Sequence, residues 1–76
     1  MHSLDQLRPG QRARIEAFNG SDALVQRLME MGLLEGDEIE VIALAPLGDP
    51  MEIRSGDTRL SLRRGDATHL KVILLP

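Results

Sequence analysis

The sequence contains no cysteine, tryptophan or tyrosine, and its one aromatic residue is Phe18. Without cysteine, neither a disulfide nor a thiolate zinc site can stabilise the fold, and the composition fits a reducing compartment. Without aromatic clusters, the chain lacks the grooves that bind proline-rich ligands and the stacking platforms that bind single-stranded nucleic acid. The net charge of −3 also argues against a partner held chiefly through phosphates. These absences favour protein recognition over nucleic-acid binding.

Long apolar runs are also missing. The longest, Val41–Ala45 and Val72–Leu75, fall far short of the roughly 20 residues that a membrane helix needs. The first residues lack the basic and apolar regions of a signal peptide. We therefore expect a cytoplasmic protein without direct membrane insertion. Its 76 residues allow one core, so we expect a single domain over residues 1–76.

The pattern expected of a catalytic site is absent. A hydrolytic site needs a nucleophile, a base and a group that orients the base. The only histidines are His2 and His69, the serines have no evident partner, and the sequence has no G-x-x-x-x-G-K-[ST] phosphate loop. We therefore expect no independent enzymatic activity.

Alternating apolar and polar residues predict five short strands. In the first, alternation turns Ala17 inward and Phe18 outward, and in the second it turns Ala43 inward and Leu44 outward. Turns rich in glycine, proline and aspartate separate the segments. The predicted strands are Gln11–Phe18, Glu38–Ala45, Met51–Arg54, Thr58–Leu62 and Leu70–Leu75.

One segment follows a helical period instead. Leu24, Leu28 and Met31 form an apolar stripe that predicts one amphipathic helix over about residues 21–31. Gly32 stands where a left-handed residue ends a helix, and Leu33 can fold back onto the last turn. One helix and five strands predict a mostly β fold, with a small SH3-like barrel as the best fit and an OB-like barrel second.

Three segments carry a resemblance to a known family. Arg27–Gly36 resembles the arginine–leucine, glycine–leucine and proline–glycine pattern of the ferrous iron transport protein A (FeoA) family, with Glu35 where proline is common. Ala45–Pro50 matches the family's most distinctive loop, and Leu60–Arg63 matches the strand after it. In this order and at these spacings, the segments identify the chain as similar to FeoA over most of its length.

The resemblance implies an SH3-like barrel that acts as a cytosolic accessory to a ferrous iron transporter. That transporter, FeoB, is a larger membrane protein with a GTP-binding domain in the cytoplasm, and the implied action is regulatory contact between the two proteins. The barrel is also similar to the C-terminal domain of iron-dependent repressors. A metal-responsive regulatory domain is therefore the alternative.

Metal ligands are sparse. Ferrous iron prefers imidazole and carboxylate ligands, usually three or more from the protein. Asp66 and His69 are spaced to share one face, with Glu52 or Asp57 as a further ligand. Two neighbouring ligands predict at most weak Fe²⁺ binding, and we expect no resident cofactor.

The partner site is predicted at the Ala45–Pro50 loop and the adjoining helix end. Two prolines restrict this loop, and Leu47 at its apex is either an exposed anchor or a plug that folds into the barrel. Asp49 is expected to accept backbone hydrogen bonds that hold the turn. Exposed apolar side chains also suit a second copy, so self-association stays open. The predicted partner-binding residues are Leu28, Leu33, Pro46, Leu47, Asp49 and Pro50.

Overall fold

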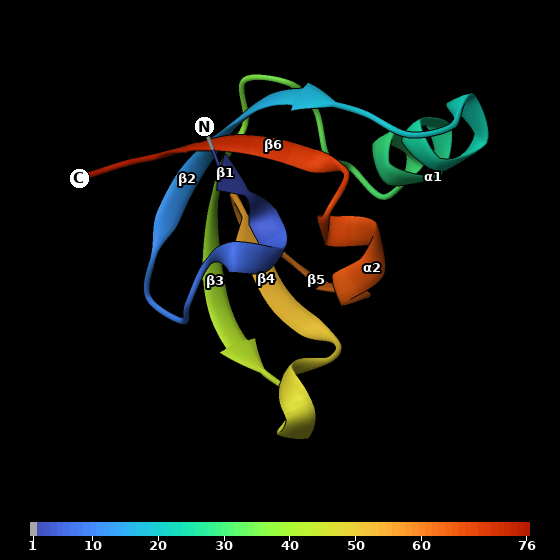
Figure 1. Cartoon of the computed structure of the whole chain (residues 1–76). Coiled ribbons are helices and arrows are strands. Elements are labelled where there is room, and N and C mark those ends of the chain that lie inside the picture. Colours follow the sequence, from blue (N-terminus) through green and yellow to red (C-terminus); the bar gives the residue numbers. More distant parts are fainter. Residues whose placement is uncertain (1) are drawn as a thin grey trace.

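The computed structural model describes residues 2–76 and contains one antiparallel sheet of six strands (Figure 1). Its spatial order is β1-β6-β2-β3-β4-β5. The mostly β fold with one main helix is confirmed, but the prediction of five strands missed the first. That strand has two residues, too few for any periodic pattern. The strands are β1 (His2–Ser3), β2 (Arg12–Phe18), β3 (Glu38–Leu44), β4 (Met51–Ser55), β5 (Thr58–Leu62) and β6 (Leu70–Leu74).

The main helix, α1 (Asp22–Glu30), links β2 to β3 and has a defined beginning and end. The Ser21 hydroxyl oxygen accepts a hydrogen bond from the backbone N–H of Leu24 at 3.1 Å, which caps the first turn. At the other end, the N–H of Leu33 donates to the carbonyl of Leu28, and Gly32 adopts φ 103°. This is a Schellman ending, as the sequence predicts.

Two bulges change which residues face the core. The pairing of β2 with β6 shifts register after Ile15, and the pairing of β3 with β4 shifts after Val41. Each shift reverses the alternation beyond it. Phe18 and Leu44 therefore pack against the core while Ala43 is exposed. The prediction that strict alternation continues to the strand ends is wrong at these positions.

The core lies against one face of the curved sheet and is apolar. Within residues 2–76, no polar or charged residue is buried. The 3₁₀ turn η1 (Leu4–Gln6) contributes Leu4, and the short helix α2 (Arg64–Ala67) contributes Ala67. In that described range, no helix is long and apolar enough to cross a membrane.

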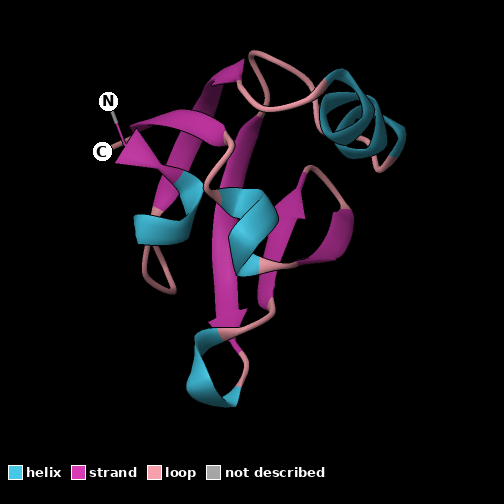
Figure 2. Cartoon of the chain, turned by 45° about the vertical axis from the view of Figure 1, so that its right-hand side comes forward, coloured by secondary structure: helices cyan, strands magenta, loops and turns pink. Residues whose placement is uncertain are grey.

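The loop between β3 and β4 lies far from α1. This loop contains a second 3₁₀ turn, η2 (Pro46–Gly48). Figures 1 and 2 agree that η2 and α1 project from opposite ends of the molecule, with the sheet between them. Any site built on the loop is therefore spatially separate from the helix.

Candidate partner-binding site

The β3–β4 loop presents an apolar side chain to solvent. The N–H of Gly48 donates to the carbonyl of Ala45 at 2.7 Å and closes a turn. Leu47 has φ 72° and ψ 7°, the geometry of the third position of a type II turn, which favours glycine or asparagine. Its side chain is fully exposed, at 104% of the reference area. Leu47 is thus at the apex as predicted, and the alternative in which it plugs the barrel is wrong.

Contacts from distant parts of the chain hold the loop in place. Asp49 accepts a hydrogen bond at 3.0 Å from the backbone N–H of Arg64, at the start of α2. The Arg64 guanidinium donates to the carbonyls of Gly48 at 3.4 Å and Asp5 at 2.7 Å. Asp49 therefore joins the loop to α2 rather than closing the turn itself. Arg64 was not predicted to belong to the site, because no local pattern connects it with a loop 15 residues away.

The predicted helix residues do not belong to this surface. Leu28 and Leu33 are fully buried, so they hold the end of α1 in the core and offer no side-chain surface to a partner. The prediction that they bind the partner is wrong. The predicted loop residues do lie together: Pro46, Leu47 and Asp49 are exposed, and Pro50 is half-buried.

The candidate metal ligands already have protein partners. Asp66 Oδ2 accepts a hydrogen bond from Arg27 of α1 at 3.1 Å. His69 Nδ1 lies 3.2 Å from Oδ1 of Asn19, just before α1. Across residues 2–76, no three histidine, aspartate or glutamate side chains gather as metal ligands. In this structure, Asp66 and His69 instead tie the α2–β6 region to both ends of α1.

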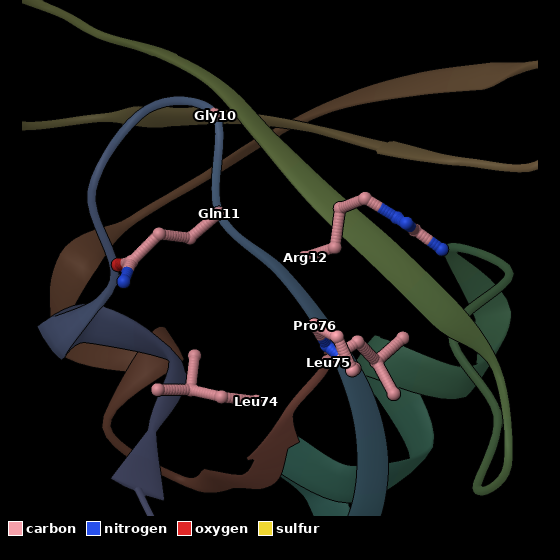
Figure 3. Close-up of a pocket in the computed structure, with 6 residues that line it drawn as sticks. All are labelled: Gly10, Gln11, Arg12, Leu74, Leu75 and Pro76. Atoms are coloured by element: carbon pink, nitrogen blue, oxygen red, sulfur yellow. The ribbon is translucent and has the colours of Figure 1, made fainter.

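A hollow of about 220 Å³ lies between the start of β2 and the end of β6 (Figure 3). It is smaller than the roughly 300–1,000 Å³ of typical small-molecule sites. Figure 3 shows the side chains of Gln11 and Arg12 pointing in different directions, so they do not converge on a ligand. The hollow therefore lacks the converging side chains that a cofactor site needs. Its lining residues are Gly10, Gln11, Arg12, Leu74, Leu75 and Pro76.

Comparison with solved structures supports the fold. The chain superposes on iron(II) transport protein A from Clostridium thermocellum with a TM-score of 0.90 and 37% identity, covering 96% of this chain and 45% of that one. The zinc complex of FeoA from Stenotrophomonas maltophilia, described as a prokaryotic SH3 domain protein, gives 0.80 and 30%, covering 96% and 91%. The SH3-like prediction is confirmed. A manganese-dependent transcriptional repressor shares the fold alone, with a TM-score of 0.88 and 13% identity over 97% of this chain and 41% of that one.

Sequence comparison identifies the family. The chain is 39% identical over 72 residues to a protein of Porphyromonas gingivalis, the Fe(2+) transport protein A/Fe(2+) transporter FeoB fusion protein. The match covers 95% of this chain and 8% of that protein, so the chain corresponds to a small part of it. The model of the FeoA domain matches residues 2–74. The chain therefore belongs to the FeoA family, which is involved in ferrous iron transport.

Proposed function

We propose that this chain is a cytosolic accessory protein of bacterial ferrous iron uptake that binds the GTP-binding part of a FeoB-type transporter. The fusion protein of Porphyromonas gingivalis supports this pairing, because its name joins the two proteins in a single chain. Covalent linkage raises the effective concentration of one domain around the other, which favours their contact. In this proposal the chain acts by contact and not by catalysis.

The observation that carries the proposal is the conformation of Leu47. Holding a leucine in the left-handed region costs about 1–2 kcal/mol, and glycine would relieve most of this strain. Its side chain also contributes no burial to the fold, because it is fully exposed. Such strained residues concentrate at functional sites. We therefore assign Leu47 as the apolar anchor that a partner buries.

The rest of the loop prepares this anchor for binding. Pro46 restricts the backbone directly before Leu47, and Asp49 and Arg64 fix the loop to α2 and η1. A segment that is already ordered loses little conformational entropy when it binds. The preorganised loop therefore lets one leucine contribute strongly to affinity.

Two substitutions of Leu47 test the proposal, with calorimetric affinity for the transporter's cytosolic domain measured beside thermal stability. Leu47→Ala should weaken binding by about 1–2 kcal/mol and leave the melting temperature nearly unchanged. Leu47→Gly should weaken binding at least as much while stabilising the fold by about 1 kcal/mol, because it removes the strain.

Leu74→Ala is the matched control, because Leu74 is also exposed, at 38%, but lies on β6 away from the loop. It should leave affinity unchanged. Wild-type affinity for both Leu47 variants would contradict the proposal. If sedimentation shows a self-association that Leu47→Ala abolishes while affinity for the transporter domain is unchanged, the anchor meets a second copy instead.

A further inference from the structure

The strand β5 forms one free edge of the sheet. Its ladder partner is β4, and Figure 2 shows it as the outermost strand on the right-hand side. The turn Gly56–Asp57 joins Ser55 to Thr58, so a turn hydrogen bond pairs these two residues. Hydrogen-bonded and non-bonded pairs then alternate along the ladder. It follows that the backbone N–H and C=O groups of Arg59 and Ser61 point away from β4.

Nothing in the described chain occupies this edge. Outside the β4–β5 ladder, the backbone of Arg59 and Ser61 makes no hydrogen bond to other backbone groups of residues 2–76. Both residues are exposed, whereas Leu60 and Leu62 turn toward the core. The strand contains no proline, and its register with β4 is unbroken. It therefore lacks two of the devices by which proteins commonly block strand pairing.

The charge along the edge is positive. Arg63 directly follows β5 with φ −62° and ψ 139°, so the extended backbone continues and its side chain shares the outward face with those of Arg59 and Ser61. The nearest carboxylate to Arg59 belongs to Glu52, at 3.9 Å, and Arg63 has no ion pair within the described residues. Two exposed guanidinium groups thus flank the open backbone groups of Ser61.

We propose that the β5 edge binds an extended acidic segment of a partner protein by strand addition. The backbone groups of Arg59 and Ser61 pair with the incoming strand, and Arg59 and Arg63 face carboxylates at alternate positions of that strand. A second copy fits less well. When two β5 strands pair with Ser61 opposite Ser61, Arg59 faces Arg63, and like charges directly opposite each other destabilise the pair.

The probe is a blocked peptide as long as the five-residue strand, with the sequence Glu-Val-Glu-Val-Glu, added to the ¹⁵N-labelled protein. Binding should slow amide hydrogen exchange at Arg59 and Ser61 and shift their resonances more than those of β1, the opposite edge. The basic peptide Lys-Val-Lys-Val-Lys should bind about tenfold more weakly, because its charges repel Arg59 and Arg63.

Ser61→Pro removes the outward N–H without breaking the β4–β5 ladder, so it should weaken binding of the acidic peptide about tenfold or more. Ser61→Ala keeps that N–H and should bind like the wild type. The double substitution Arg59→Glu and Arg63→Glu leaves the backbone intact and should reverse the preference between the two peptides. This variant keeps the test valid if Ser61→Pro does not fold.

Four outcomes would overturn the proposal. It would fail if the acidic peptide did not bind, or if the protein resonances that it shifts mapped away from β5. It would also fail if the folded Ser61→Pro variant bound this peptide as well as Ser61→Ala does. Equal binding of the acidic and basic peptides would remove the charge complementarity on which the acidic partner rests. None of these results depends on the role of Leu47, so the two surfaces are tested independently.

Discussion

At the scale of single residues, Gly32 and Leu47 both adopt a left-handed backbone conformation, but only Leu47 carries a side chain there. Gly32 has φ 103° at the end of α1, where a glycine adopts this conformation without a steric penalty. Leu47 has φ 72° in the β3–β4 loop, a position that would also favour glycine but is occupied by leucine. The left-handed angle of Gly32 can be predicted from the sequence, because a glycine directly after the apolar stripe of a helix commonly ends the helix in this conformation. The backbone angle of Leu47 is not predictable, since leucine rarely takes it.

Gly32→Ala should lower the melting temperature. Apart from Gly32 and its two chain neighbours, no atom lies within 4 Å of the position of an added Cβ, so the cost comes from the local backbone conformation alone. A penalty of about 1 kcal/mol corresponds to about 4–8 °C in a domain of this size. Gly65→Ala is the matched control: Gly65 also has open space, but its φ is not positive and it lies in α2. Equal melting temperatures for the two variants would show that Gly32 does not need its left-handed angle.

At the scale of elements, the sequence predicts where strands and helix lie but not the bulges within them. Alternation alone assigns Phe18 and Leu44 to the outer face, whereas the register shifts in β2 and β3 turn both toward the core. A bulge depends on the pairing with a neighbouring strand, which a single strand's sequence does not contain. In the sequence, the only sign of the bulge in β3 is that the strand is apolar on both of its faces near Leu44.

Phe18→Ala tests the bulge in β2. Because Phe18 packs against the core, the change should destabilise the domain by about 2 kcal/mol, less than full burial would give. Ala43→Ser is the control in β3, because alternation places Ala43 inside and the structure places it outside. That change should alter stability by less than about 0.5 kcal/mol in urea denaturation. If Phe18→Ala left the stability unchanged and Ala43→Ser lowered it, the result would support uninterrupted alternation instead.

The contact between the β3–β4 loop and α2 gives a second test at this scale. Arg63 precedes α2 and provides no side-chain cap, whereas Asp49 accepts the hydrogen bond from the Arg64 N–H. Asp49→Ala should therefore cost about 1 kcal/mol, as the loss of a helix cap does, and should speed amide exchange at Gly48. Asp49→Asn keeps an acceptor oxygen and should lie closer to the wild type. If both variants exchange at the wild-type rate, this contact does not hold the loop.

At the scale of the whole molecule, the β3–β4 loop and the helix α1 lie at opposite ends, and an exposed leucine lies in the loop while another follows the helix in the sequence. Leu47 is at the tip of the β3–β4 loop, and Leu34, 52% exposed, follows the end of α1. Figures 1 and 2 place the sheet between these ends. An interface of standard size covers about 800 Å² of each partner, less than a fifth of the 4548 Å² surface of this chain. An interface centred on the β3–β4 loop therefore leaves more than four fifths of that surface uncovered.

This separation predicts that the two positions act independently. Leu47→Ala should weaken binding to the transporter's cytosolic domain by about 1–2 kcal/mol, whereas Leu34→Ala should change it by less than about 0.5 kcal/mol. The double variant should then match Leu47→Ala alone, because the sites share no contacts. Calorimetric titration of all three variants measures these differences directly. A loss of affinity on Leu34→Ala that adds to the loss on Leu47→Ala would mean that the partner encloses both ends, and the binding surface would then have to include the end of α1 after all.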